Sequence, residues 1–202
     1  MILKYKVSLL ACGIFFAGTA SFAGNLSLYS FTEGAADQGM PNLSSGDENV
    51  AIGDEALKAN HSGSNNTAIG DEALKSNTSG SKNTAVGKDS LHSNTSGQQN
   101  VAIGFEALEK NTSGQKNVAI GVEAGNSNTT GNFNTSVGNE ALKSNTSGFG
   151  NTAIGADSLK TNITGYNNTG LGLNSLEANT YGNFNTGVGV GSLNKNTSGS
   201  NN

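Results

Sequence analysis

The sequence lacks several residue types, and each absence narrows what the protein can do. Its 202 residues include no Arg, no Trp, a single Cys and two His, and only 13% of the side chains are charged. Without Arg, and with eleven Lys scattered along the chain, there is no cluster of cations to bind nucleic acid or anionic lipid. We therefore expect no nucleic-acid partner.

The single cysteine, Cys12, lies in an N-terminal segment that has the order of an export signal. Two lysines precede an apolar run over 7–16, and the small residues Ser21 and Ala23 follow it. This order predicts a signal peptide over 1–23, because the run is too short for a membrane anchor. Cleavage would leave nine Lys against fifteen acidic residues, a net charge of −6, and no membrane span. It would also remove the only thiol available for a disulfide, a metal or a nucleophile.

Large apolar residues are scarce for a chain of this length, at 34% hydrophobic and 6% aromatic. Such a chain is either disordered or built of many thin layers. Residues 49–201 divide into nine units of seventeen residues without insertion or deletion, and Asn202 begins a tenth. A disordered tract tolerates slips of register, so this fixed period indicates that each unit lies on the one before it.

Four positions are the same in all nine units, counted from the Asn that begins each unit. They are the first (Asn), the fifth (Gly), the twelfth (Asn) and the fifteenth (Gly), which in the second unit are Asn66, Gly70, Asn77 and Gly80. Gly adopts positive φ without steric cost, and Asn tolerates left-handed geometry at turns. Stacked Asn side chains can also hydrogen-bond from unit to unit as ladders. We expect these residues to form the corners of each coil.

The remaining positions predict an all-β fold, a parallel β-solenoid or β-roll of nine 17-residue coils over 49–202. The fourth position is always aliphatic, and the ninth is Leu in every unit except at Gly125. We expect these two positions to form a narrow core. The third and eighth positions carry only Ala, Ser or Gly, which would leave room for a neighbouring chain. Residues 24–48 are expected to be a polar leader or an N-terminal cap.

The two halves of each unit have different local preferences. "NTAIG" favours a short strand, whereas "DEALK" contains strong helix formers and pairs such as Glu72 and Lys75, three residues apart. We expect one strand per coil and, opposite it, either a second strand or a single helical turn. At about 4.8 Å per coil the rod would be on the order of 40 Å long. A core this thin is marginal for a monomer, so self-association through the Ala-rich face is expected.

The "NTAIG", "NVAIG" and "NTAVG" runs resemble the head repeats of trimeric autotransporter adhesins, the YadA-like group of bacterial surface proteins. The resemblance covers 49–202 and implies a parallel β-roll that packs as a homotrimer and attaches to host matrix or to other cells. Family heads usually have a shorter repeat, and no heptad stalk or membrane-anchor strands follow the repeats in this sequence. The protein would then be held at the surface by a partner, released, or a shortened form. We expect secretion or display on a bacterial outer surface.

Catalysis is not expected, because the titratable groups do not converge. His61 and His92 occupy different positions two coils apart, so neither a shared metal nor a cofactor is expected. The seventh position is acidic in seven units, which indicates a solvated edge partly paired with Lys, or alternatively a column that binds calcium. Threonine is frequent at the second and thirteenth positions, and ice binding is a further alternative.

Aromatic residues are unevenly placed, and five of them fall in the later units. They occupy turn positions that carry polar residues in the earlier units: Phe133, Phe149, Tyr166, Tyr181 and Phe184. Aromatic side chains at such positions indicate a contact surface for a partner or a sugar, or equally for a neighbouring chain.

Overall fold

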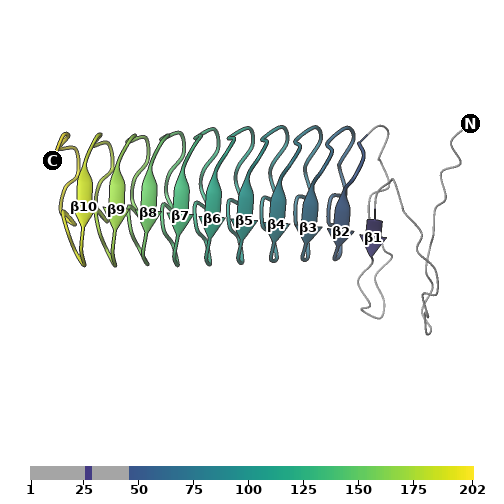
Figure 1. Ribbon diagram of the computed structural model, residues 1–202, viewed down its shortest axis with the longest axis horizontal. Coiled ribbons are helices and arrows are strands. Elements are labelled where there is room, and N and C mark those ends of the chain that lie inside the picture. The colour runs from purple at the N-terminus through teal and green to yellow at the C-terminus, as the bar shows by residue number, and fades with distance from the viewer. Residues whose placement is uncertain (1–25, 29–45) are drawn as a thin grey trace, which may run out of the picture.

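The computed structural model describes residues 26–28 and 46–202, which form a rod of stacked coils (Figure 1). One parallel sheet of ten strands runs along the rod, and its strands follow one another in chain order. The fold predicted from the repeats, an all-β parallel solenoid with a seventeen-residue period, is confirmed. The proposed signal over 1–23 and most of the proposed cap over 24–48 lie outside the described residues.

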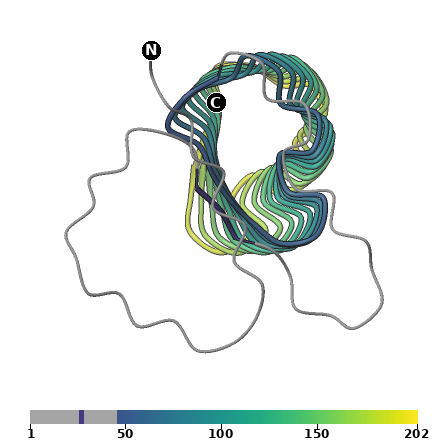
Figure 2. The same ribbon diagram turned by 90° about the vertical axis from the view of Figure 1, so that its right-hand side faces the viewer.

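Each coil contributes one three-residue strand at its second to fourth positions. The strands are β2 (Val50–Ile52), β3 (Thr67–Ile69), β4 (Thr84–Val86), β5 (Val101–Ile103), β6 (Val118–Ile120), β7 (Thr135–Val137), β8 (Thr152–Ile154), β9 (Thr169–Leu171) and β10 (Thr186–Val188). A further strand, β1 (Leu26–Leu28), pairs in parallel with β2 and adds a strand to the N-terminal end of the sheet. Equivalent positions pair throughout, as in Ala68 with Ala85, so every column of side chains runs along the rod. Viewed along the axis, successive coils overlie one another with a small progressive offset (Figure 2).

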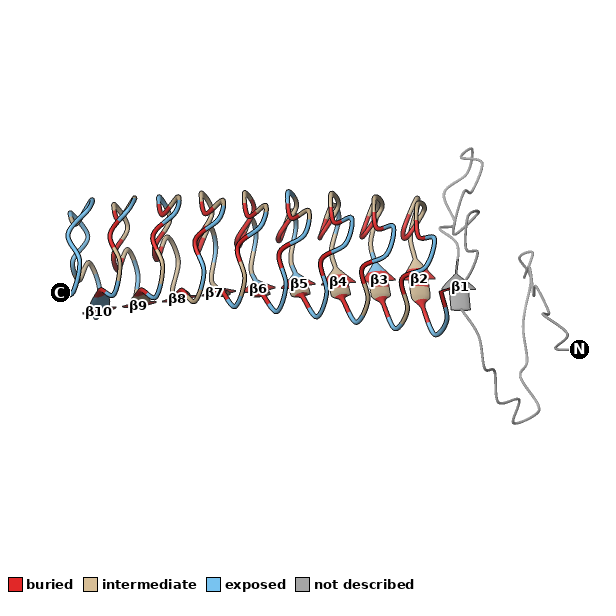
Figure 3. Ribbon diagram, turned by 90° about the horizontal axis from the view of Figure 1, so that it is seen from above, coloured by how far each residue is buried: buried red, intermediate tan, exposed pale blue. Residues whose placement is uncertain are grey.

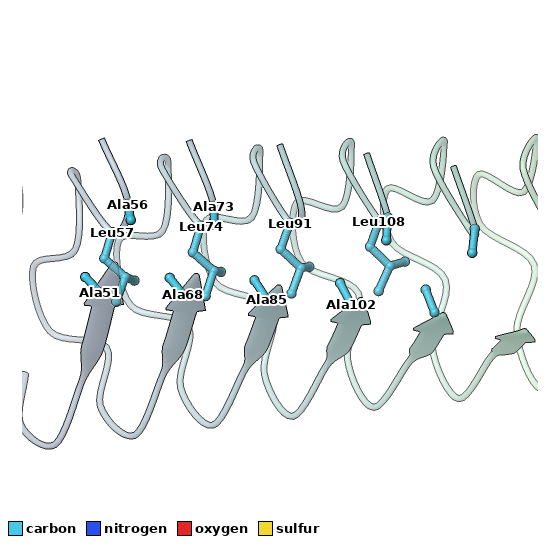
Figure 4. Close-up of a cluster of buried hydrophobic side chains, with 13 residues drawn as sticks. Ala51, Ala56, Leu57, Ala68, Ala73, Leu74, Ala85, Leu91, Ala102 and Leu108 are labelled. Carbon is cyan, nitrogen blue, oxygen red and sulfur yellow. The ribbon is translucent and has the colours of Figure 1, made fainter. Parts of the chain in front are cut away.

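The core consists of the small third and eighth positions and the ninth-position leucines. In the second coil Ala68, Ala73 and Leu74 are fully buried, and the leucines point toward the inner face of the strands (Figure 4). The fourth-position aliphatic residues are not in this core, and Ile69 is 37% exposed. The expectation that the fourth position is buried and that the alanines face a neighbour is therefore wrong. Because successive strand residues point to opposite faces, a buried third position places the second and fourth positions outside.

The half of each coil opposite the strand is neither of the two structures expected for it. Across residues 46–202 no helix or second strand forms there, and the backbone turns through left-handed residues at the seventh and ninth positions. In the second coil these are Glu72 at φ 57° and Leu74 at φ 52°. The Lys75 N–H bonds to the Glu72 carbonyl, while the Leu74 N–H bonds to the Ser90 carbonyl of the next coil. Alternate N–H groups thus bond within and between coils, which satisfies the backbone without regular structure.

The exceptional Gly125 adopts the same left-handed conformation as the leucines of the other coils. It occupies the ninth position at φ 60°, where Gly has no steric cost. A Cβ at this residue would lie 3.1 Å from Leu108 Cδ2 and 3.3 Å from Ser136 Oγ. The coil after the one that lacks the leucine carries Ser136 at its third position, where most coils have Ala, and Ser136 lies beside Gly125.

Candidate functional site

Two ladders of buried asparagines run through the rod. Asn66 Nδ2 donates to Asn49 Oδ1 at 3.0 Å and to the Gly80 carbonyl at 2.9 Å. Asn77 Nδ2 donates to Asn60 Oδ1 at 2.7 Å and to the same Gly80 carbonyl at 3.0 Å. Among the described side chains, every buried nitrogen and oxygen atom has a hydrogen-bond partner. Asn66 and Asn77 therefore serve the fold, and their amides are occupied.

The invariant glycines mark close contacts between coils. A Cβ on Gly70, where φ is 139°, would lie 2.5 Å from the Gly87 carbonyl oxygen. A Cβ on Gly80 would lie 2.4 Å from Asn77 Oδ1. Gly80 is thus needed where the chain passes the asparagine ladder, and Gly70 where the chain leaves the strand.

The outer side of the sheet carries partly exposed residues along the rod (Figure 3), and those at the fourth position are aliphatic. We call it the sheet face, and define it by the second-position and fourth-position residues of β2 to β10. Ile103, Ile120 and Ile154 in the middle of the rod are each 39% exposed. The sequence pattern could have indicated this exposed face, because the small third position alternates with larger residues at the second and fourth positions.

The residues that border the sheet face become less charged toward the C-terminal coils. Two residues after each strand, at the sixth position, the first three coils carry Asp54, Asp71 and Lys88, and Lys88 pairs with Asp71 at 2.6 Å. Four of the six later coils carry large exposed apolar residues at this position, and the other two carry Asn139 and Ala156; the four are Phe105, Val122, Leu173 and Val190. Exposed apolar surface that is continuous and bordered by polar residues is typical of an interaction site.

A ladder of ion pairs joins the seventh-position acids to tenth-position lysines. Lys75 Nζ lies 2.5 Å from Glu55 of the preceding coil and 2.9 Å from Glu72 of its own coil. Lys160 likewise pairs with both Glu140 and Asp157. The lysine hydrogen bonds lower the pKa of Glu55, Glu72 and Glu140. The spacing of three residues predicted the pairs within one coil, but the pairs between coils depend on the stacking.

The lysine ladder is interrupted in the third to fifth coils, where the tenth position is His92, Glu109 or Asn126. Asn126 Nδ2 donates to Glu109 Oε2 at 2.8 Å and to Glu106 Oε2 at 3.3 Å. Burial makes the largest contribution to a raised pKa of Glu106, and repulsion from Glu109 and other acids adds to it. This stretch of the rod is therefore locally acidic, whereas the carboxylates on either side of it are paired.

Removing the negative charge should change stability in opposite directions for a glutamate that lies among other acids and for one that is paired with lysines. Ionised Glu106 opposes folding above its ordinary pKa of 4.5 because its folded-state pKa is raised. We expect Glu106→Gln to stabilise the protein at neutral pH by about 0.5 kcal/mol, and the matched Glu140→Gln, which loses two lysine partners, to destabilise it by a similar amount. Thermal denaturation checks both.

The pH dependence separates these effects from general changes in packing. The gain in Glu106→Gln should disappear below pH 4.5, where the wild-type carboxyl is also neutral. Because the pKa of Glu140 is lowered, its contribution should be complete above pH 4.5 and should decrease progressively as the pH falls from 4.5 through that lowered pKa. Equal shifts of the two variants in the same direction would contradict this account.

His92 takes the place of a lysine in the same ladder. Its Nε2 lies 3.0 Å from Glu72 Oε2, and His92, Glu72 and Asp89 each place one possible ligand atom within 4.8 Å of the others. The same Glu72 oxygen is 2.9 Å from Lys75 Nζ, so a cation at this point would compete with the lysine. His61 is exposed at a different position of the first coil. The sequence did not predict that His92 bridges two coils.

Three of the five aromatic residues form a row on the later coils, which we call the aromatic row: Phe149, Tyr166 and Phe184. Phe149 and Tyr166 stack with ring centroids 4.9 Å apart, and Phe184 meets Tyr166 edge-on at 5.2 Å. Phe149 is 46% exposed and Phe184 is 50% exposed. The other two residues are also exposed: Phe133, which lies below Lys116 with Nζ 5.0 Å from the ring centroid, and Tyr181.

Comparison with family models, with curated proteins and with solved structures found no match to the chain. In the part of the chain that the structure describes, no helix has the length and apolar character needed to cross a membrane. Three features recur along the surface of the described coils: the sheet face, the ion-pair ladder and the aromatic row.

Proposed function

We propose that the protein is an exported, non-catalytic rod that assembles through its sheet face and supports attachment at a cell surface. The observation that carries the proposal is the exposed apolar column of fourth-position residues on a regular sheet. In a monomer this column would remain in water. Contact with a second copy would bury it, and the free energy gained is proportional to the apolar area that is buried.

Geometry and charge favour another copy of the same chain as the partner. The column has the same spacing at every coil, so two copies aligned along their axes can repeat one contact along the rod. The sheet face carries no charged residue from β2 to β10, and the middle of an interface is typically depleted of charge. Three copies is the number implied by the resemblance to trimeric adhesin heads, and the signal-like N-terminus supports export.

The test is the solution mass of the purified protein by light scattering. We expect the mass of three chains for the wild type and of one chain for Ile120→Asp, because the new carboxylate would be buried without a partner at the centre of the interface. Gln98→Asp, at an exposed turn position, is the matched control and should remain trimeric. A wild-type mass equal to one chain would exclude the assembly.

One observation favours ice binding as a second candidate. Threonines occupy the second position in four consecutive paired strands: Thr135, Thr152, Thr169 and Thr186. They lie on the same face as the fourth-position aliphatic residues and form a regular array. The thirteenth-position threonines are less suited to this role, since Thr95 Oγ1 donates to the Thr112 carbonyl. Thermal hysteresis of a monomeric protein would support ice binding, and its absence would exclude it.

A further inference from the structure

The aromatic row occupies positions where the fold itself favours other residues. At the sixteenth position a serine or asparagine side chain accepts the N–H of the preceding coil: Ser81 Oγ accepts from Ser64 at 3.0 Å, and Asn183 Oδ1 accepts from Tyr166 at 2.9 Å. Phe149 and Tyr166 stand at this position, and their rings carry no equivalent acceptor. Each of these two residues therefore gives up a bond that supports the stack elsewhere.

The seventeenth position shows the same pattern. Phe184 adopts φ 56° and Phe133 adopts φ 58°, in the left-handed region. Asn65 and Asn167 hold the same position in other coils, and Asn tolerates this conformation better than a bulky aromatic residue. Residues that depart from the local preferences of the fold are expected at functional sites.

The surroundings of the aromatic row are polar but uncharged. The turn segments 146–150, 163–167 and 180–184, which carry the row, contain no charged residue. They expose hydroxyl and amide groups beside the rings, including Ser147, Thr164 and Asn167. Aromatic rings provide flat apolar surfaces for the C–H groups of a sugar ring, and hydroxyl and amide groups bond its hydroxyls. The lack of cations disfavours a sulfated or phosphorylated ligand.

We infer that the aromatic row binds a neutral oligosaccharide or polysaccharide chain laid along the rod. The rings recur at successive coils, about 4.8 Å apart along the axis, so a linear glycan can contact several of them at once. This inference names a ligand class for the proposed attachment role and rests on that role for its biological meaning. The binding itself does not require the protein to be a trimer.

The test compares the full chain with a variant in which Phe149→Ser, Tyr166→Ser and Phe184→Asn are combined. These replacements are residues that other coils carry at the same positions, so the variant should keep the fold and its melting temperature. Titration calorimetry with cellohexaose, chitohexaose and maltohexaose should show wild-type binding to at least one of them. The triple variant should lose at least about tenfold in affinity. Phe105→Ser, an exposed aromatic change after β5, is the matched control and should bind normally.

Several results would overturn the inference. They are wild-type protein that binds none of the three neutral sugars, wild-type protein that binds heparin instead, or a triple variant that binds as the wild type does. A triple variant that loses oligomeric mass or melting temperature would assign the rings to a chain contact or to the core. A monomeric wild type that still binds sugar would exclude the proposed assembly while supporting this site.

Discussion

Replacing Gly104 by Ala is expected to destabilise the protein by more than about 4 kcal/mol, which is exceptional for a single substitution. Gly104 adopts φ 138°, and a Cβ there would lie 2.3 Å from the carbonyl oxygen of Gly121 in the next coil. The obstructing atom belongs to the backbone, so no side-chain rotation relieves the contact. Denaturant unfolding followed by circular dichroism measures the loss.

Gly189 provides the matched control, because it has the same position in the last coil. Its φ is 118°, but a Cβ there would meet nothing within 4 Å. Gly189→Ala therefore keeps the unfavourable backbone conformation without the clash, and it should cost only about 1–2 kcal/mol. Equal losses in the two variants would show that backbone conformation alone, and not the approach of successive coils, requires glycine at this position.

Replacing Asn94 by Ala is expected to have the second large effect, a loss of at least about 3 kcal/mol. Asn94 Nδ2 donates to Asn77 Oδ1 at 2.7 Å and to the Gly97 carbonyl at 3.1 Å, and its Oδ1 accepts from Asn111 Nδ2 at 2.8 Å. Alanine would remove one hydrogen-bond partner from each of three groups inside the rod: Asn77 Oδ1, the Gly97 carbonyl and Asn111 Nδ2. A buried group left unsatisfied costs roughly 1–3 kcal/mol.

The corresponding residue of the last coil, Asn196, separates burial from hydrogen bonding. It makes the same type of bonds, to Asn179 Oδ1 at 2.8 Å and to the Gly199 carbonyl at 3.0 Å, but it is only half-buried. Water can replace its bonds, so Asn196→Ala should cost about 1 kcal/mol or less. If both variants lost the same stability, the ladder would not depend on exclusion of water.

These two effects follow from an architecture in which each coil contacts only its neighbours. Strand contacts join consecutive strands throughout the described sheet, from β1 to β10. The stability of such a rod is close to a sum of coil and nearest-neighbour terms. A defect in the fourth coil should therefore interrupt the stack between two folded parts, whereas a defect in the last coil should fray only the end.

The sequence by itself determined the architecture of the repeats. Seventeen-residue spacing without a slip requires identical positions to stack, because any other register would separate Asn66 from Asn83 and Gly70 from Gly87. The corner residues were also identifiable, since only Gly and Asn combine turn geometry with small size or a stackable amide. The parallel in-register pairing of every strand follows from that repetition.

The tertiary structure alone decided which side of the strand faces inward. A three-residue strand such as Thr67–Ile69 gives too short an alternation to choose a face, and side-chain size alone would place the larger Ile69 inside. Leu74 reaches the interior from the opposite turn and leaves room only for Ala68 beside it. Leu74 adopts a left-handed conformation, which leucine intrinsically disfavours. Local propensity therefore favours a helix or a strand for this segment. Stacking supplies the bonds that hold this conformation, and those bonds exist only between coils.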